Sequence, residues 1–330
     1  MSDVVIASDR NYLHLVSTCA VSLFETNPGE KFHLHLLSNG LDMRELEALK
    51  TIVEGYQGQL SVYPIENLRK RLTVDVPSTI SVTSYARLFA GSILPKDLDK
   101  VFYIDCDIVF NGAIKELFDM DLADNLVCGV LDPLISRTYK KEIKIPMDEP
   151  YINAGVLMIP LNQWRSEGME QRFVDYLVAN GGKVHHHDQG MINAVCVGRK
   201  KILPPQFNVM SNSICYPWKC LHKINIPFYS RSEYKNGISN PIIIHFTGAI
   251  LGRPWVEGCR HPYADRFLKF KVKTVYKDLP IKPNNQSMLH RWEGIFYRTL
   301  PFYVFKLYMQ TRYSLAYVNH RLRKSRFEKK

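Results

Sequence analysis

The seven residues at positions 101–107, V-F-Y-I-D-C-D, constrain the fold of this chain more than any other stretch. The first four are apolar with β-branched and aromatic character, which is typical of a buried strand in an α/β sheet. The strand ends on two carboxylates, Asp105 and Asp107. Ligands of open α/β sheets bind beyond the carboxyl ends of the strands, so these acids could hold a divalent cation and, through it, phosphate. A D-x-D pair also occurs by chance in Asp-rich turns.

Strands and helices alternate on both sides of this stretch. Apolar runs predict further strands at residues 4–7, 32–37, 60–63, 126–131, 151–160 and 242–244, and apolar periodicity predicts helices at residues 15–23, 43–53, 84–94, 114–118, 164–178 and 191–197. The alternation predicts an α/β fold with a mixed, mostly parallel central sheet flanked by helices. Residues 204–210 and 215–219 are predicted to be loops, and residues 138–150 a mobile loop that covers a site.

Several function classes are disfavoured by missing patterns. Neither G-x-G-x-x-G nor G-x-x-x-x-G-K-S/T follows a predicted strand, which argues against dinucleotide and P-loop sites. The seven cysteines include no C-x-x-C pair, so neither a zinc knuckle nor a disulfide framework is expected. There is no run of 18 apolar residues and no signal-peptide pattern, so we expect a cytoplasmic protein.

Polar residues follow other predicted strands as well. Asp132 ends one strand and His245 ends the last. Asp9 and Asn11 follow the first strand and could recognise a base or ribose, or simply cap the next helix. A histidine at a strand end is ordinarily a satisfied polar residue, but here it is the third strand end with a potential ligand. Beyond it, Gly248, Gly252 and Arg253 could offer N–H groups and a guanidinium to a diphosphate.

Four other positions have both a functional and a structural interpretation. Arg87 could pair with the strand-end carboxylates or lie on the surface. Gly155 allows either a close backbone approach or a tight turn. Asp188 and Gln189 begin a predicted helix and could bind a ligand or cap that helix. The preceding histidines, at 185–187, are adjacent and cannot all face one ion, so a His-only metal site is not expected.

Taken together, these pieces resemble the family 8 glycosyltransferases. These are retaining, metal-dependent sugar transferases of GT-A fold, and the resemblance is greatest to the bacterial α-glucosyl- and α-galactosyltransferases that build the lipopolysaccharide outer core. Order and spacing fit across about residues 3–270. The matching motifs are A-S-D-R-N-Y at 7–12, S-Y-A-R-L at 84–88, Y-I-D-C-D at 103–107, Asp132, Y-I-N-A-G-V-L at 151–157, D-Q-G-M-I-N at 188–193, Q-F-N at 206–208, and H-F-T-G with R-P-W at 245–255.

The resemblance implies a UDP-sugar donor bound with Mn²⁺. Asp105, Asp107 and His245 would ligate the ion, and such a mixed oxygen and imidazole set suits Mn²⁺ better than the alternative, Mg²⁺. The residues implied to surround the transferred sugar, which are the catalytic candidates, are Asp132, Asn153, Asp188 and Gln189. The residues implied to contact the rest of the donor are Ala7, Asp9 and Asn11 at the uridine, and Arg87, Asp105, Cys106, Ala154, Gly155, Gly248 and Arg253 elsewhere.

Two departures from the family pattern bear on the mechanism. The family often has Lys directly before Pro-Trp, where this chain has Arg253 after a lengthened A-I-L-G loop. Many relatives read Asp-Gln-Asp, whereas the third residue here is Gly190, which excludes a carboxylate nucleophile at that position. Gln189 is a poor nucleophile, so a double displacement is disfavoured. We expect front-face substitution, in which the acceptor hydroxyl attacks on the side that UDP leaves and the departing phosphate acts as base.

The C-terminal part of the chain is strongly basic. The net charge is +11, and residues 306–330 hold eight Lys and Arg against one Glu. An apolar stripe through Met288, Trp292, Ile295 and Phe296 resumes after Pro301 through Phe302, Phe305, Met309, Tyr313 and Ala316. The sequence therefore predicts a GT-A domain at 1–275 and an amphipathic extension at 276–330 that binds the anionic cytoplasmic face of the inner membrane. The alternative is a helix that packs on the domain or on a dimer partner.

The predicted function is transfer of glucose or galactose from a UDP-sugar to a hydroxyl of a cell-surface glycan, such as the lipopolysaccharide core. A self-glycosylating or protein-glycosylating relative is the nearest alternative, and a UDP-sugar binding protein without turnover is another. The charge also suggests nucleic-acid binding, but the chain has no recognition module, and the acidic strand ends would repel phosphate without a metal. We expect no nucleic-acid partner. The sequence leaves the sugar, the linkage and the oligomeric state open.

Overall fold

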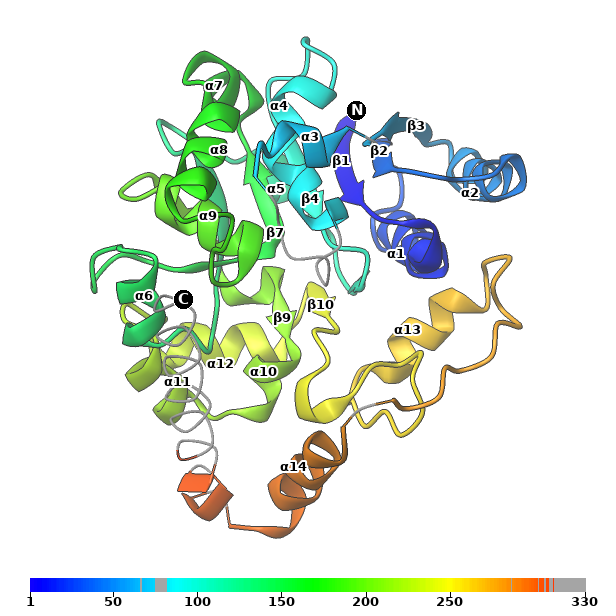
Figure 1. Cartoon of the computed structure of the whole chain (residues 1–330). Helices are drawn as coiled ribbons and strands as arrows, with labels where there is room; N and C mark the ends of the chain where they lie inside the picture. Colours follow the sequence, from blue (N-terminus) through cyan, green and yellow to red (C-terminus); the bar gives the residue numbers. More distant parts are fainter. Residues whose placement is uncertain are drawn as a thin grey trace.

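The fold is built on one large sheet (Figure 1). The computed structural model describes residues 1–65, 67–74, 82–285, 287–301, 303–305, 307, 308 and 311. Seven strands lie in the order β3-β2-β1-β4-β7-β6-β8. They are β1 (Ser2–Ala7), β2 (Phe32–Ser38), β3 (Gln59–Pro64), β4 (Val101–Ile104), β6 (Val127–Leu131), β7 (Ile152–Ile159) and β8 (Lys200–Ile202). Only β7 runs antiparallel to its neighbours, so the predicted mixed, mostly parallel sheet is confirmed.

Helices cover both faces of this sheet, which explains why its central strands are apolar throughout. All four residues of β4 are fully buried. On one face Phe24 packs edge-on against Phe32, and the opposite face contacts the segment around Arg87. The α-helices are α1 (Leu13–Thr26), α2 (Met43–Gly55), α3 (Leu68–Arg71), α4 (Ala90–Ile93), α5 (Lys115–Phe118), α6 (Arg137–Glu142), α7 (Leu161–Ser166), α8 (Met169–Ala179), α9 (His187–Val195), α10 (Ser211–Cys215), α11 (Trp218–Ile224), α12 (Arg231–Ser239), α13 (Ala264–Lys271) and α14 (Met288–Thr299).

A second, three-stranded sheet was not predicted. It has the order β5-β10-β9, with β5 (Ile108–Phe110), β9 (Val209–Met210) and β10 (Ile243–His245). The strand β5 begins directly after Asp107, and its first residue, Ile108, pairs with His245 in antiparallel register. Asp107 therefore lies where the chain passes from the large sheet to the small one. This crossing brings the end of β10 beside the acidic stretch.

Two predicted helices differ from the observed ones. Residues 82–89 form a 3₁₀-helix, η2 (Val82–Phe89), and only the short α4 follows it. The predicted helix at 164–178 is divided into α7 and α8 by Gly168, whose φ of 60° lies in the left-handed region that favours glycine. The other short 3₁₀-helices are η1 (Arg10–Tyr12), η3 (Pro205–Phe207) and η4 (Ala249–Leu251).

The loop predictions for residues 138–150, 204–210 and 215–219 are wrong in part. The first segment contributes to α6, and it is anchored by Lys140, which is almost fully buried. The Lys140 ammonium donates to the carbonyl oxygens of Met147, Glu149 and Ile226. These bonds tie the segment to its own end and to a distant part of the chain. Residues 204–210 contain η3 and β9, and residues 215–219 contain the end of α10 and the start of α11.

The first part of the C-terminal extension packs on the rest of the protein. Phe305 is fully buried, with ring centroids of Tyr216 and Tyr297 at 6.4 and 5.4 Å. The Tyr297 hydroxyl donates to the Cys215 carbonyl at 3.2 Å. This agrees with the alternative interpretation of a helix packed on the domain. Trp292 remains half-exposed. Phe302, Met309, Tyr313, Ala316 and the basic run from Arg321 lie outside the described residues.

Of the helices that the structure describes, none has the length and apolar character needed to cross a membrane.

Acid should destabilise the fold through His261. This side chain is 3% exposed, packs edge-on against Phe246, and has a buried Nε2 without a hydrogen-bond partner. Burial lowers the pKa of His261 to about 4. Because the unfolded chain titrates near 6.5, it binds more protons than the folded chain between these values, and the free energy of unfolding falls as the pH falls. Between about pH 7 and pH 5 the loss from this group is about 2 kcal/mol.

Urea unfolding of the wild type and of His261→Phe at the two pH values checks this expectation. The phenyl ring keeps the apolar packing against Phe246 and cannot titrate. We expect the wild type to lose about 2 kcal/mol more than the variant over this pH range. Equal losses in the two proteins would contradict the assignment.

Candidate active site

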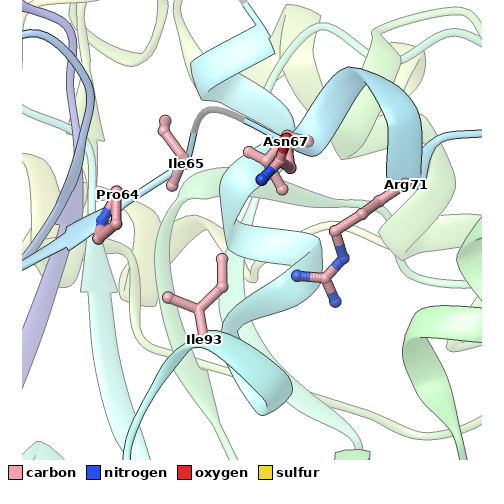
Figure 2. A pocket seen from close by; sticks show the side chains of 6 residues that line it. Pro64, Ile65, Asn67, Arg71 and Ile93 are labelled. Carbon is pink, nitrogen blue, oxygen red and sulfur yellow. The ribbon is translucent and has the colours of Figure 1, made fainter.

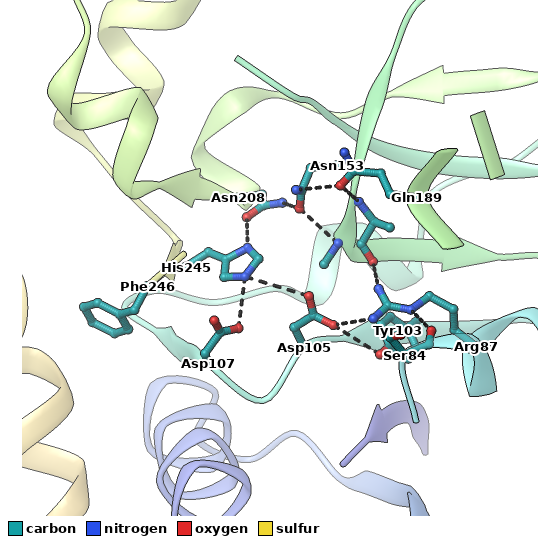
Figure 3. Close-up of polar contacts among 12 residues, drawn as sticks. Ser84, Arg87, Tyr103, Asp105, Asp107, Asn153, Gln189, Asn208, His245 and Phe246 are labelled. Carbon is teal, nitrogen blue, oxygen red and sulfur yellow. Dashed lines mark hydrogen bonds and ion pairs between the residues drawn. The ribbon is translucent and has the colours of Figure 1, made fainter. Parts of the chain in front are cut away.

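Asp105, Asp107 and His245, called here the strand-end triad, lie together where the two sheets meet (Figure 3). One ligand atom from each side chain lies within 4.8 Å of the others. His245 Nε2 is 3.0 Å from Asp107 Oδ1 and 3.8 Å from Asp105 Oδ2. The other ring nitrogen, Nδ1, is 3.0 Å from Asn208 Oδ1, so Asn208 accepts its proton and Nε2 faces the carboxylates. Two oxygen ligands and one oriented imidazole fit a divalent transition-metal ion.

The charges of the strand-end triad stabilise one another. Burial by itself would lower the pKa of His245, but Asp107 and then Asp105 raise it above its usual value. Burial would raise the pKa of Asp107, but His245 and Arg253 lower it below its usual value. The two carboxylates thus favour the charged form of His245, and a metal ion at this site would compete with that proton for Nε2.

Gly155 closes the floor of the site. The Asp105 amide donates to the Gly155 carbonyl at 2.8 Å, so β7 lies directly against the end of β4. A Cβ atom at position 155 would lie 2.7 Å from Asp105 Oδ2 and would also collide with the His245 ring. The predicted close backbone approach is therefore present, and what it approaches is the strand-end triad itself.

Gly155→Ala should weaken metal binding. The added methyl group must displace Asp105 or His245 from its present position, and we expect the affinity for Mn²⁺ to fall by about 10-fold or more. Calorimetric titration with Mn²⁺ measures this change. Gly55→Ala is the matched control, because a Cβ atom at that helical position meets nothing within 4 Å. An unchanged dissociation constant in Gly155→Ala would contradict the crowding argument.

Arg87 connects the strand-end triad to α9. It is 5% exposed, and its Nη2 donates to Asp105 Oδ1 at 2.8 Å while its Nε lies 3.0 Å from Asp188 Oδ2. Its Nη1 donates to the Ala154 carbonyl, and its guanidinium lies 4.3 Å from the ring centroid of Tyr103. Of the two interpretations of Arg87, the pairing with strand-end carboxylates is the one observed.

The Arg87 ion pairs change the titration of both partners. Burial alone would lower the pKa of Arg87, but Asp105 and Asp188 raise it above its usual value. Burial raises the pKa of Asp188 to about 6, although Arg87 acts in the opposite direction. Asp188 is thus held beside Arg87 at the start of α9 rather than exposed to a ligand on its own.

Asn153, Gln189 and Asp132 form an amide network beside the strand-end triad. Gln189 Oε1 accepts from Asn153 Nδ2 at 3.0 Å and from the Ala154 amide at 3.1 Å. Asp132 Oδ2 accepts from Gln189 Nε2 at 3.2 Å and from Asn153 Nδ2 at 3.4 Å. The structure therefore brings together residues that are 57 positions apart in the sequence, and leaves Asp132 with neutral partners only in this network.

The predicted uridine contacts lie at the end of β1. Since Ile6 pairs with Ile104 in parallel register, Ala7 lies level with Asp105 on the neighbouring strand. Asp9 caps η1 and accepts from the Asn11 amide at 2.9 Å, which is the simpler of its two interpretations. Cys106 contacts Ser8 at the end of the same strand.

Gly248 and Arg253 lie on the other side of the strand-end triad. Gly248 has a φ of 86°, and a Cβ atom there would be 3.3 Å from Arg253 Nε. Arg253 Nε donates to the Phe246 carbonyl at 3.3 Å, and the positive charge of the guanidinium acts on both Asp107 and His245. Arg253 is therefore close enough to the triad to act with it on a bound anion.

Two residues of this region received no role from the sequence. Tyr103 donates to Asp105 Oδ1 at 3.2 Å, and its position two residues before Asp105 on β4 could have suggested a shared face. Asn208 donates to Asn153 Oδ1 at 2.9 Å while accepting from His245, so it joins the amide network to the strand-end triad (Figure 3). Its Q-F-N motif was recognised, but the pairing of β9 with β10 that places it was not.

A cavity of about 350 Å³ lies elsewhere, between the end of β3 and α4 (Figure 2). Its lining residues are Pro64, Ile65, Asn67, Leu68, Arg71 and Ile93. Arg71 is engaged there with Glu170 at 2.7 Å. None of the predicted site residues lines this cavity, so the cavity is separate from the candidate active site at the junction of the two sheets.

Comparison with known proteins gives a consistent picture. The family model "Glycosyl transferase family 8" matches residues 3–259. The chain is 27% identical over 291 residues to a lipopolysaccharide 1,2-glucosyltransferase of Escherichia coli, covering 86% of this chain and 81% of that protein. It is 22% identical to a lipopolysaccharide 1,3-galactosyltransferase of Salmonella typhimurium, covering 82% and 77%. A crystal structure of the galactosyltransferase LgtC with donor and acceptor sugar analogues superposes with a TM-score of 0.71 at 25% identity, covering 83% and 96%.

Proposed function

Because the chain belongs to glycosyl transferase family 8, we propose that it is a retaining hexosyltransferase that acts on the lipopolysaccharide core. The donor in this proposal is UDP-glucose or UDP-galactose, and the acceptor is a hydroxyl group of the core saccharide. The relatives with lipopolysaccharide glucosyl- and galactosyltransferase activity support the reaction class. The observation that carries the proposal is the position of the strand-end triad directly beside the amide network, an arrangement that would put a cation site in contact with a sugar site.

The strand-end triad would hold Mn²⁺, and the bound ion would act as a Lewis acid toward the diphosphate of the leaving UDP. Asp105 is held in place by hydrogen bonds from Arg87 and Tyr103. Arg253 adds a second positive charge on the side of Asp107 and would stabilise the negative charge that develops on the leaving phosphate. Ala7, Asp9, Asn11 and Cys106 would contact the nucleoside.

The amide network would orient the transferred sugar. Asn153 and Gln189 are both hydrogen-bonded to Asp132, which leaves the network with one carboxylate and two neutral amides. Asp188 is paired with Arg87 instead of facing a substrate alone. We therefore favour front-face substitution, in which the acceptor hydroxyl attacks on the side of the departing phosphate and transfers its proton to it. A trapped glycosyl adduct on Asp132 or Asp188, found by mass spectrometry, would contradict this mechanism.

Release of UDP from UDP-glucose, UDP-galactose and UDP-N-acetylglucosamine tests the proposed donor site. The assay compares protein with added Mn²⁺ against protein treated with EDTA and then dialysed. We expect slow hydrolysis of one hexose donor with Mn²⁺ and none after metal removal. No hydrolysis of any donor, together with no Mn²⁺-dependent binding of UDP, would refute the assignment of the strand-end triad.

The extension would bring the enzyme to its lipid-linked acceptor at the cytoplasmic face of the inner membrane. Its support is the basic composition of residues 306–330 and the half-exposed Trp292 on the packed part of the extension. Each Lys or Arg near an anionic bilayer contributes about 1 kcal/mol to binding. Removal of residues 312–330, which leaves the buried Phe305 in place, should therefore reduce sedimentation with vesicles of anionic lipid. Unchanged sedimentation would count against a membrane role for the extension.

A further inference from the structure

A second group of metal-ligating side chains lies on the large sheet, away from the strand-end triad. Asp3 on β1 and His33 and His35 on β2, called here the histidine cluster, place one ligand atom each within 4.8 Å of the others. The register explains the grouping, because Asp3 pairs with His33 and alternate residues of a strand point to the same face. His35 is fully buried, while Asp3 and His33 are partly exposed, so an ion could enter from solvent.

The spacing of the histidine cluster fits a small tetrahedral ion. Asp3 Oδ1 lies 2.9 Å from His35 Nε2 and 3.7 Å from His33 Nδ1. Ligands at about 2.0–2.1 Å from a tetrahedral Zn²⁺ are about 3.3 Å apart, which lies between these two separations. The centroids of the two imidazole rings are 3.9 Å apart, at an interplanar angle of 35°, so the two β2 histidines lie next to each other on one face of the sheet.

The nitrogens that face away from the cluster already have partners. His33 Nε2 is 2.8 Å from Ser61 Oγ, and His35 Nδ1 is 3.0 Å from the Tyr63 hydroxyl oxygen, both on β3. Histidines that bind metal ions characteristically donate their second N–H to such an oxygen, which fixes the tautomer and the ring orientation. Each histidine of the cluster thus has one nitrogen held by β3 and the other directed toward Asp3.

The histidine cluster is separate from the proposed transferase site. Asp3 is four residues before Ala7 on the same strand, a distance of about 13 Å along a β-strand. The ligand types also differ, since the strand-end triad offers two carboxylates and one imidazole, whereas the cluster offers two imidazoles and one carboxylate. Nitrogen-rich sets favour Zn²⁺ over the harder Mn²⁺.

We propose that Asp3, His33 and His35 bind one Zn²⁺ ion, with water as the fourth ligand. The ion would join β1 to β2 and, through Ser61 and Tyr63, to β3. This site is independent of the sugar-transfer activity, because none of its residues belongs to the strand-end triad or to the amide network. The bound ion would increase the stability of the end of the large sheet that is formed by β1, β2 and β3.

Equilibrium dialysis of the full-length protein against Zn²⁺ alone tests the proposal. The Asp107→Ala variant is the starting protein, because it removes a ligand of the other candidate metal site. We expect it to bind one Zn²⁺ per chain and to melt at a higher temperature when Zn²⁺ is present. Adding His33→Ala or Asp3→Ala, two partly exposed positions, should lower the affinity by at least about 100-fold and abolish the rise in melting temperature.

His222→Ala in the same starting protein is the matched control. His222 is a partly buried histidine that stacks on Trp218 and contacts its carbonyl oxygen, with no carboxylate among those contacts. We expect it to keep the bound Zn²⁺ and the rise in melting temperature. A starting protein that binds no Zn²⁺, or a His33→Ala variant that binds it as tightly as the control, would overturn the proposal.

Discussion

Asp107→Asn should lower kcat for sugar transfer by about 1,000-fold, which corresponds to about 4 kcal/mol of transition-state stabilisation. The substitution keeps the size of the side chain and removes the negative charge that holds both His245 and the proposed cation. Asp107 Oδ1 lies 3.0 Å from His245 Nε2, so the substitution also removes the carboxylate nearest to His245. The weaker cation site would in turn stabilise less of the charge that develops on the leaving phosphate.

Initial rates of transfer at saturating donor, measured over a range of Mn²⁺ concentrations, check this expectation. The variant should need more Mn²⁺ for half-maximal activity and should stay far below the wild type at saturation. Asp124→Asn, an exposed position on a turn, is the control and should retain full activity. A variant at position 107 that keeps more than about a tenth of the wild-type rate would show that this carboxylate is dispensable.

Arg87→Met should destabilise the fold by about 3–5 kcal/mol. The guanidinium is paired with both Asp105 and Asp188 in a buried position, and its removal leaves two carboxylates without their partner. The cost is that of an uncompensated buried charge rather than the strength of the ion pairs themselves. Added Mn²⁺ should recover part of the loss, because a cation at the strand-end triad would compensate Asp105.

Urea unfolding of Arg87→Met can be compared directly with that of Arg10→Met. Arg10 also pairs with two carboxylates, Asp42 at 2.8 Å and Glu45 at 2.9 Å, but its side chain is 56% exposed. Exposed pairs of this kind contribute at most about 1 kcal/mol. The two variants therefore differ mainly in burial. Similar losses in both would mean that burial of the Arg87 pairs is not what makes them important.

The strands and their polar ends could be predicted from the sequence because both are local properties. Residues 101–104 are apolar on both faces, as a central strand must be, and both carboxylates lie within the next three residues of the chain. Arg87 and Gly155 were also found, although with two interpretations each. Only the fold decides between these interpretations, because it places Arg87 against both Asp105 and Asp188, which is 101 positions away.

The parts that could not be predicted depend on pairing between distant segments. The strand β5 is three residues long and β9 only two, too short for a periodic pattern. Their pairing with β10 is what places Asn208 against His245. The histidine cluster shows the same limit, since His33 and His35 form no recognisable motif until the register places Asp3 beside them. The three consecutive histidines at 185–187 are easier to notice in the sequence. Two of them, His186 and His187, have left-handed backbone angles at the start of α9.

The hydrogen bonds of Asn208 have a consequence for the order of events at the site. One end of its amide accepts from His245 and the other donates to Asn153, so Asn208 joins the proposed cation site to the proposed sugar site. A ligand bound at one of these proposed sites would fix the position of Asn208 for the other. We therefore expect the metal ion and the donor to bind cooperatively, with each raising the affinity of the other by the same factor, as thermodynamic linkage requires.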